Sequence, residues 1–235
     1  MTRMYAETKT WNPFLGCEYD CVYCKPSFQA TIARFTRLSG RDCDACLQYQ
    51  PHEHPERLAR IPSARIIFVF GDGDITFARP EFVEFTIQKI KECLLRGAWK
   101  TFYFQSKNPT CFRQYLDDLR PIQDHVVLLT TLETNRNAGY DKISKAPPPS
   151  ERFRDFFDLD WPRKIPTIEP VMAFDLEIFV DQIKRIHPEA VYLGYNSRPR
   201  KVQLPEPSQQ EFWALRQALS QFTEVRLKDT RSPKP

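Results

Sequence analysis

Three of the seven cysteines in this 235-residue sequence fall within eight consecutive residues. Cys17-Glu-Tyr-Asp-Cys21-Val-Tyr-Cys24 has the spacing C-x3-C-x2-C. Three thiolates on one short loop can ligate three irons of a single 4Fe-4S cluster, which leaves the fourth iron open to another ligand. A zinc site or a ferredoxin-type cluster would need a fourth protein ligand that this loop does not supply. The spacing therefore favours an open cluster, and the alternatives are a structural zinc site or a chance grouping.

A second group combines two more cysteines with two of the four histidines. Cys43, Cys46, His52 and His54 follow the spacing C-x2-C-x5-H-x-H, within a stretch from 39 to 62 that matches no regular element. Cysteine and histidine together suit tetrahedral zinc, and a zinc ion could fold a loop that has no core of its own. The alternative is an exposed loop with two ordinary thiols. A second iron–sulfur cluster is disfavoured, because it would need further ligands.

Short β-branched and aromatic runs alternate with helical patterns along the chain, which is typical of βα units around a parallel sheet. We expect an α/β fold, a partial (βα)6 TIM-like barrel, with the 39–62 stretch as an insertion. Its strands are expected at 9–12, 65–70, 101–105, 126–132, 164–169 and 191–193, with 224–227 as a candidate seventh. Helices are expected from Pro80, over 110–119, around Phe153, from Asp175 to Ile186, and over 209–222. In such barrels the chemistry gathers at the carboxyl ends of the strands.

The cysteine loop and its flanks resemble a known enzyme superfamily. Tyr23 gives the loop the form C-x3-C-x-aromatic-C, and Thr10-Trp-Asn-Pro-Phe-Leu-Gly-Cys17 precedes it. The sequence resembles radical SAM enzymes, in particular the spore-photoproduct-lyase-like branch and short phage-associated radical SAM proteins of unknown function. The resemblance implies that Cys17, Cys21 and Cys24 hold a 4Fe-4S cluster whose open iron chelates S-adenosylmethionine (SAM). It implies reductive cleavage of SAM to a 5′-deoxyadenosyl radical, an electron donor such as flavodoxin or ferredoxin, and sensitivity to oxygen.

The resemblance also implies where SAM contacts the chain. Gly71-Asp72-Gly73-Asp74 follows the second strand, where the family carries a Gly-Gly-Glu-like motif against the methionyl amino group, so either aspartate is a candidate. Polar residues at later strand ends would meet the carboxylate and ribose, and an apolar one the adenine. The candidates there are Ser106, Lys107, Thr131, Glu133 and Ile168, beside Tyr23 in the cluster loop. The alternative for each polar one is that it merely ends a strand or forms a turn.

Two further cysteines have less distinctive positions. Cys111 stands at a helix start just after the third strand, on the face where the chemistry is expected, and is a candidate hydrogen-atom donor to a substrate radical, with an inert thiol as the alternative. Cys93 lies near the apolar side of its helix, where a buried, inert thiol is expected.

The overall composition limits the setting. With 41% hydrophobic and 27% charged residues the chain is expected to fold, as one domain over 1–227 with a disordered tail at 228–235. No run approaches a membrane span and no signal segment is evident, so we expect a cytoplasmic protein without a membrane partner. The net charge of +4 permits a nucleic-acid partner without requiring one. Two basic stretches, 57–65 and 198–201, together with the resemblance to the spore-photoproduct-lyase-like branch, make a nucleic acid or nucleotide the first substrate expectation. The rival from another class is a non-enzymatic iron–sulfur or zinc protein that binds nucleic acid.

Overall fold

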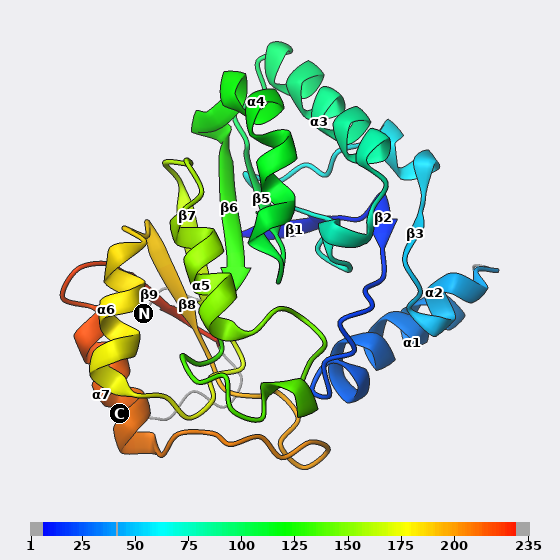
Figure 1. Cartoon of the computed structure of the whole chain (residues 1–235). Helices are drawn as coiled ribbons and strands as arrows, with labels where there is room; N and C mark the ends of the chain where they lie inside the picture. Colours follow the sequence, from blue (N-terminus) through cyan, green and yellow to red (C-terminus); the bar gives the residue numbers. More distant parts are fainter. Residues whose placement is uncertain (1–6, 41, 229–235) are drawn as a thin grey trace.

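A curled sheet of seven parallel strands forms the centre of the computed structural model, which describes residues 7–40 and 42–228 (Figure 1). Each strand pairs in parallel with its neighbours. Their order across the sheet is β1 (Thr8–Trp11), β4 (Ile66–Val69), β5 (Thr101–Gln105), β6 (Val126–Thr131), β7 (Lys164–Ile168), β8 (Ala190–Leu193) and β9 (Glu224–Leu227). The protein is thus α/β with a half-barrel sheet, compatible with a TIM-like partial barrel. The candidate seventh strand is confirmed, so the sheet has one strand more than a (βα)6 unit.

Five helices cover the convex side of the sheet (Figure 1). They are α3 (Pro80–Leu95), α4 (Leu116–Leu119), α5 (Pro149–Phe157), α6 (Leu176–Arg185) and α7 (Gln209–Leu219). Each contributes buried apolar side chains to one continuous core with the outward-facing strand residues. In α3, for example, Val83, Ile87 and Ile90 recur at helical spacing and are fully buried. Burial of this stripe, more than the short helices' own propensity, fixes their position.

Strand residues alternate between that core and the concave side. A smaller apolar cluster lies on the concave side, formed by Tyr103, Val127, Leu129, Ile165, Ala190 and Tyr192. Further along the same strands the concave side becomes polar, with Gln105 next to Thr131 and Thr167 at hydrogen-bonding distance. The carboxyl ends of the strands therefore present hydrophilic side chains to the inside of the half-barrel.

Several helix ends differ from expectation. The 110–119 helix is divided into a 3-10 segment η4 (Pro109–Tyr115) and the single α-turn α4. Asp175 precedes α6 as expected, but its carboxylate accepts from Arg136 at 2.6 Å instead of capping the helix. The last helix, α7, ends at Leu219 and starts with a capping box between Ser208 and Glu211. Lys228 is the one residue of the expected tail within the described part of the chain; 229–235 lie outside it.

The 39–62 stretch contains short elements where none were expected. These are α2 (Asp44–Gln48), β3 (His52–Glu53) and the 3-10 segment η2 (Pro55–Ala59). β3 pairs antiparallel with β2 (Phe14–Leu15), which directly precedes the cysteine loop. Elements of two to five residues carry too little periodicity to be recognised from sequence. Figure 1 shows α1 (Ala30–Leu38) and α2 beside β2 and β3, apart from the helices on the convex side.

None of the helices in the described ranges combines the length and the apolar character needed to cross a bilayer.

Candidate functional site

The cysteine loop, residues 17–24, is held in place by two other segments. On one side Val22 N donates to Ile143 O at 2.9 Å and Lys145 N donates to Tyr19 O at 2.7 Å. On the other side Gly16 forms a parallel bridge with Gly73. The loop is therefore attached to the β6–α5 connection and to the loop after β4, both of which lie at the carboxyl ends of strands. This is the edge of the sheet at which the chemistry was expected.

Gly16 and Gly73 each lie where a side chain would collide with a neighbouring segment. A Cβ on Gly73 would lie 2.9 Å from Gly16 O. Gly16 has φ +101° and a Cβ there would lie 2.2 Å from Gln50 O. Two polypeptide segments can approach this closely only where no side chain separates them. Gly73 thus allows the loop after β4 to lie against Gly16, and Gly16 allows the backbone at Gln50 to lie against the residue that precedes Cys17.

All seven cysteines have free thiols; in the loop, Cys21 is buried and Cys17 and Cys24 are partly buried. The Cys21 Sγ lies 3.1 Å from Ser144 Oγ, and the Cys17 Sγ accepts from Tyr19 N at 3.5 Å. Burial, with Asp74 nearby, raises the pKa of the Cys17 thiol well above its usual value. Burial raises the pKa of Cys24 to about 11. Without a cationic partner the sulfurs of Cys17 and Cys24 are neutral thiols, whereas a bound metal would stabilise their thiolates.

Two adjoining cavities open beside these thiols at the carboxyl ends of the strands. The first, of about 480 Å³, is lined by all three loop cysteines and is called here the cysteine cavity. Its other lining residues are Thr8, Thr10, Tyr23, Phe28, Tyr49, Phe68, Gly71, Gly73, Asp74, Gln105, Lys107, Thr131, Glu169 and Lys228. The second, of about 580 Å³, shares Tyr23, Cys24, Lys107 and Thr131 with it and is more polar; we call it the outer cavity. Volumes of this size are usual for small-molecule sites.

Cys24 stands where the loop turns into a helix. Its carbonyl accepts from Phe28 N at 2.9 Å and from Gln29 N at 3.1 Å, which begins the π-helical turn η1 (Lys25–Gln29) that leads into α1. π-turns inside helices are frequent at functional sites, because they turn side chains that a regular helix would direct elsewhere. In this chain the turn and the first residues of α1 carry Ser27, Phe28 and Thr31 to the wall of the outer cavity.

The two aspartates after β4 point to different places. Asp74 lines the cysteine cavity, and its carboxylate accepts from Ser106 Oγ at 2.7 Å and from the backbone N–H groups of Thr76 and Lys107 at 3.0 and 2.9 Å. Burial raises its pKa, although these donors favour the ionised form. Ser106 is fully buried, and it positions Asp74 while lining neither cavity.

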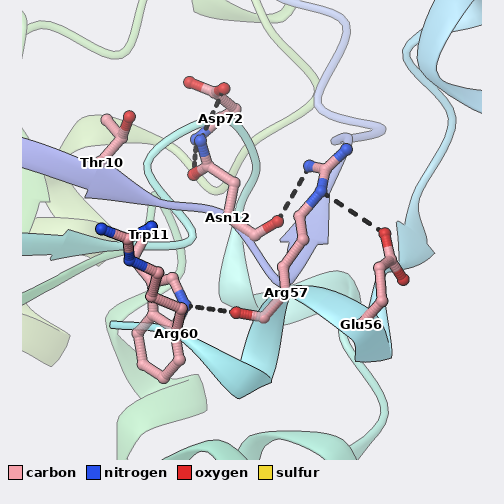
Figure 2. A pocket seen from close by; sticks show the side chains of 7 residues that line it. All are labelled: Thr10, Trp11, Asn12, Glu56, Arg57, Arg60 and Asp72. Carbon is pink, nitrogen blue, oxygen red and sulfur yellow. Dashed lines mark hydrogen bonds and ion pairs between the residues drawn. The ribbon is translucent and has the colours of Figure 1, made fainter. Parts of the chain in front are cut away.

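Asp72 instead faces a third cavity, drawn in Figure 2, which lies against η2. Its carboxylate accepts from Asn12 Nδ2 at 2.7 Å, while Arg57 crosses the pocket to the Asn12 carbonyl. Burial raises the pKa of Asp72 to about 6, against the opposing effect of Arg57. Of the two candidates for the methionyl amine, only Asp74 therefore lines the cysteine cavity. The basic stretches are separated in the same way, since Arg57 and Arg60 line this third cavity whereas Arg198 lines the outer one.

A buried ionic network lies behind the cavities. Glu133 has no exposed surface, and its Oε1 accepts from Tyr23 Oη at 2.6 Å, from Tyr140 Oη at 3.1 Å and from Lys107 Nζ. Its Oε2 lies 2.8 Å from the guanidinium of the equally buried Arg152. Burial would raise the pKa of Glu133, but Arg152 and Lys107 lower it to about 2. Glu133 lines neither cavity; it orients Tyr23 and Lys107, which do.

The remaining predicted residues fall on different sides of the sheet. Thr131 lines both cavities and accepts from Gln105 Nε2 at 2.8 Å. Ile168 is fully buried in the convex-side core, away from the cavities, because it is one residue out of phase with the concave-facing Thr167. Cys111 packs against the same core and lines neither cavity; burial raises the pKa of its thiol to about 12. The partly exposed Cys93 lines a separate surface pocket.

Several residues of the site had not been predicted from the sequence, and four of them have a clear structural role. They are Tyr49, Ser144, Arg152 and Glu169. Ser144 and Arg152 reach the site only because the β6–α5 connection folds back onto the cysteine loop. Glu169 directly follows β7, so the rule that chemistry collects at strand ends would have identified it. Nothing in the local sequence marks Tyr49.

The second cysteine group converges on one point. The ligand atoms of Cys43, Cys46, His52 and His54 all lie within 4.8 Å of one another, an arrangement able to hold one metal ion. The Cys46 Sγ lies 3.2 Å from His52 Nε2 and 3.3 Å from His54 Nε2. The two Nε2 atoms are 2.8 Å apart. The spacing that predicted a zinc ligand set is thus matched by proximity in the fold.

No protein-family model matches the chain, and no curated protein matches it either.

Proposed function

We propose that this protein is a radical SAM enzyme, in which Cys17, Cys21 and Cys24 hold a 4Fe-4S cluster and SAM occupies the cysteine cavity. The observation that carries the proposal is that three thiols from one loop line a cavity at the carboxyl ends of parallel strands, together with Gly71, Gly73 and Asp74. No fourth cysteine lines it within the described ranges, so one iron would remain open to a ligand. When bound, the cluster supplies the electron that cleaves SAM to methionine and a 5′-deoxyadenosyl radical, which abstracts hydrogen from the substrate.

The fit of the chain to these groups rests on the donor set. Three cysteines of one loop supply sulfur donors to one cavity, which is the donor type that iron–sulfur clusters take, and a bound cluster would stabilise their ionised form. Gly71 and Gly73 leave the backbone of the loop after β4 without side chains at these two positions. A side chain on Gly71 has no space, because its Cβ would lie 2.8 Å from Thr10 Cγ2. The two glycines allow close approach of a ligand to the backbone, and Asp74 supplies a carboxylate for an ammonium group.

Lys107 and Thr131 are the proposed contacts for the rest of SAM. Burial lowers the pKa of Lys107, but the Glu133 carboxylate outweighs it and keeps the ammonium charged. That ammonium lies at the wall shared by the two cavities and can pair with the carboxylate of SAM, while Thr131 can hydrogen-bond the ribose. Glu133 acts as a positioning residue for Lys107 and Tyr23, and Ser106 as one for Asp74.

The outer cavity is the proposed substrate site. Lys107, Arg198 and Lys228 line it. Glu133 balances the charge of Lys107 and Glu169 that of Lys228, so Arg198 gives the wall a net positive charge. This surplus of positive charge favours an anionic substrate and supports a nucleotide or nucleic acid as the first class to test. An electron donor such as flavodoxin or ferredoxin belongs to the same proposal.

The test is the release of 5′-deoxyadenosine. After anaerobic reconstitution with iron and sulfide, the protein with SAM and dithionite should release 5′-deoxyadenosine, and Cys21→Ala should lose both the product and the visible absorbance of the cluster. Cys93→Ala in α3, outside the cavities, is the matched control and should keep both. Absence of product from cluster-loaded protein, or undiminished product from Cys21→Ala, would refute the proposal and favour a non-enzymatic metal protein.

A further inference from the structure

The segment 43–54 brings two sulfur and two nitrogen atoms to a single point. Cys43 Sγ lies 3.4 Å from His52 Nε2, and Cys46 Sγ lies within 3.3 Å of both histidine Nε2 atoms. For a tetrahedral zinc ion with bonds of roughly 2.0–2.3 Å, neighbouring ligand atoms are about 3.3–3.8 Å apart. Contacts this short suit one mononuclear ion with four protein ligands and leave no space for a multi-iron cluster.

The Nδ1 atoms of both imidazoles are held by hydrogen bonds, which fix the orientation of the rings. His52 Nδ1 lies 2.7 Å from Gln50 O, and His54 Nδ1 lies 3.0 Å from a Glu56 carboxylate oxygen. Each Nδ1 therefore donates its N–H to an oxygen. In a neutral imidazole the lone pair then lies on Nε2, which is directed at the other histidine and at the thiols. The two Nε2 atoms are 2.8 Å apart, closer than the ligand atoms around a tetrahedral zinc ion, and two lone pairs at this distance repel unless a proton or a metal ion lies between them. Carboxylate and carbonyl partners of this kind are the usual supports of metal-binding histidines.

We infer that Cys43, Cys46, His52 and His54 bind one structural zinc ion that holds the 43–54 segment against the Cys17 end of the cysteine loop. The donor set of two thiolates and two imidazoles is typical of zinc, and four protein ligands leave no open position for a substrate. The zinc assignment is independent of the proposed iron–sulfur chemistry; its effect on the cluster rests on the proposed function.

The connection to the cysteine loop runs through short elements. Leu15 and Phe14 of β2 pair with His52 and Glu53 of β3, and His54 N donates to Pro13 O at 2.5 Å. Leu15 also packs with the metal-side Cys46 and with Tyr49, in a cluster that Cys17 joins.

Tyr49 extends this contact into the cysteine cavity, whose wall it forms, and its ring meets that of Phe28 edge to face. Because α2 has five residues and β3 two, the segment has little core of its own. A metal cross-link would supply the stability that so short a segment lacks.

The first experiment measures zinc in the full-length chain. The variant Cys17→Ala/Cys21→Ala/Cys24→Ala, which cannot hold the proposed cluster, should be purified with one zinc ion per chain. Cys46→Ser/His52→Asn in that background should lose it, whereas the matched control Cys93→Ser/His187→Asn should retain it. Cobalt in place of zinc should give the visible absorption of a tetrahedral thiolate site. The assignment would be overturned if the triple alanine variant, produced in zinc-containing medium, contained no zinc, or if its zinc content were undiminished after Cys46→Ser/His52→Asn.

A second measurement does not depend on how a variant folds. Removal of zinc from the unmodified chain by a chelator should expose bonds within 43–54 to limited proteolysis, while the segments from α3 to α7 stay protected. Zinc-free chain should also incorporate several-fold less iron on reconstitution, and restored zinc should reverse this. Unchanged protease resistance of 43–54 would refute the structural role. Iron uptake absent from both forms would count against the proposed function alone, and equal iron uptake by both forms against the coupling.

Discussion

The two cysteine groups of this protein differ in what their sulfur atoms face. Cys17, Cys21 and Cys24 line a cavity shared with Lys107, whereas Cys43 and Cys46 face two imidazoles at 3.2–3.4 Å. An incomplete ligand set beside a cavity suits chemistry, because a position remains for a reacting molecule. A complete set that closes on itself suits a structural ion. Under the proposed function, the same residue type would serve two purposes according to what completes its surroundings.

The supports of the two groups differ as well. A network centred on the fully buried Glu133 and Arg152 lies behind the cysteine cavity. The second group is supported at the surface, where Glu56 holds His54 with most of its own side chain in solvent. Mutations of the two supports should therefore act on different properties, stability in the first case and metal affinity in the second.

The largest effect is expected from Glu133→Gln. This change leaves the buried Arg152 and Lys107 without their counter-charge, which should lower the free energy of unfolding by about 3–5 kcal/mol. Chemical denaturation monitored by circular dichroism measures it. Asp20→Asn removes the partner of the exposed Lys25 and, as a control, should cost at most about 1 kcal/mol. Equal losses of unfolding free energy in Glu133→Gln and Asp20→Asn would show that Glu133 is not needed to balance the charges of Arg152 and Lys107.

Gly16→Ala should affect both regions at once. The added methyl would meet Gln50 O and force an unfavourable φ, at a cost of about 2–3 kcal/mol. Gly97→Ala shares the positive φ but has nothing within 4 Å, so it isolates the strain from the clash and should be milder. Thermal unfolding gives the stability difference, and metal analysis should show less zinc and less iron in Gly16→Ala. If Gly16→Ala kept the stability of the parent and the parent's content of either zinc or iron, the two regions would not be joined at this residue.

Glu56→Gln should act on metal affinity alone. The carboxylate that accepts from His54 Nδ1 becomes a weaker acceptor, and loss of such a partner typically weakens binding about 10–100-fold. Competition with a chromophoric chelator measures the zinc affinity. Stability of the zinc-loaded form should change little, because the Glu56 side chain is 66% exposed. Glu92→Gln, another partly exposed acid in an ion pair, is the control and should leave the affinity unchanged.

The smallest effect concerns pH and the pocket in Figure 2. Burial raises the pKa of Asp72 from 3.8 to about 6, so between these values the folded state binds more protons than the unfolded state. This contribution to stability is complete below pH 3.8 and is lost as the pH rises through 6.

We expect a loss of about 1 kcal/mol from this titration, less than the roughly 3 kcal/mol of two pKa units because the pocket opens to solvent. Denaturation curves from pH 4 to 7 should show the slope in the parent and a flatter profile in Asp72→Asn, with Asp118→Asn unchanged. An identical slope in Asp72→Asn would assign the titration to another group.

Much of the framework follows from patterns that act over a few residues. The strands at 101–105 and 164–168 and the helix from Pro80 are recognisable because apolar side chains recur with the period of each element. The short elements at 44–53 were missed, because they are stabilised by contacts with β2 and α1, not by their own periodicity.

The sequence by itself determined which residues make up each proposed ligand set, because loop residues two to eleven positions apart can meet around one metal ion or cluster. It also determined that polar residues gather at strand ends. Only the tertiary structure decided where each side chain points. Asp74 lines the cysteine cavity and Asp72 does not, while Thr167 faces the concave side and Ile168 the core. Successive strand residues face opposite sides of a sheet, and only the packing of helices on one side defines which of them is the inside.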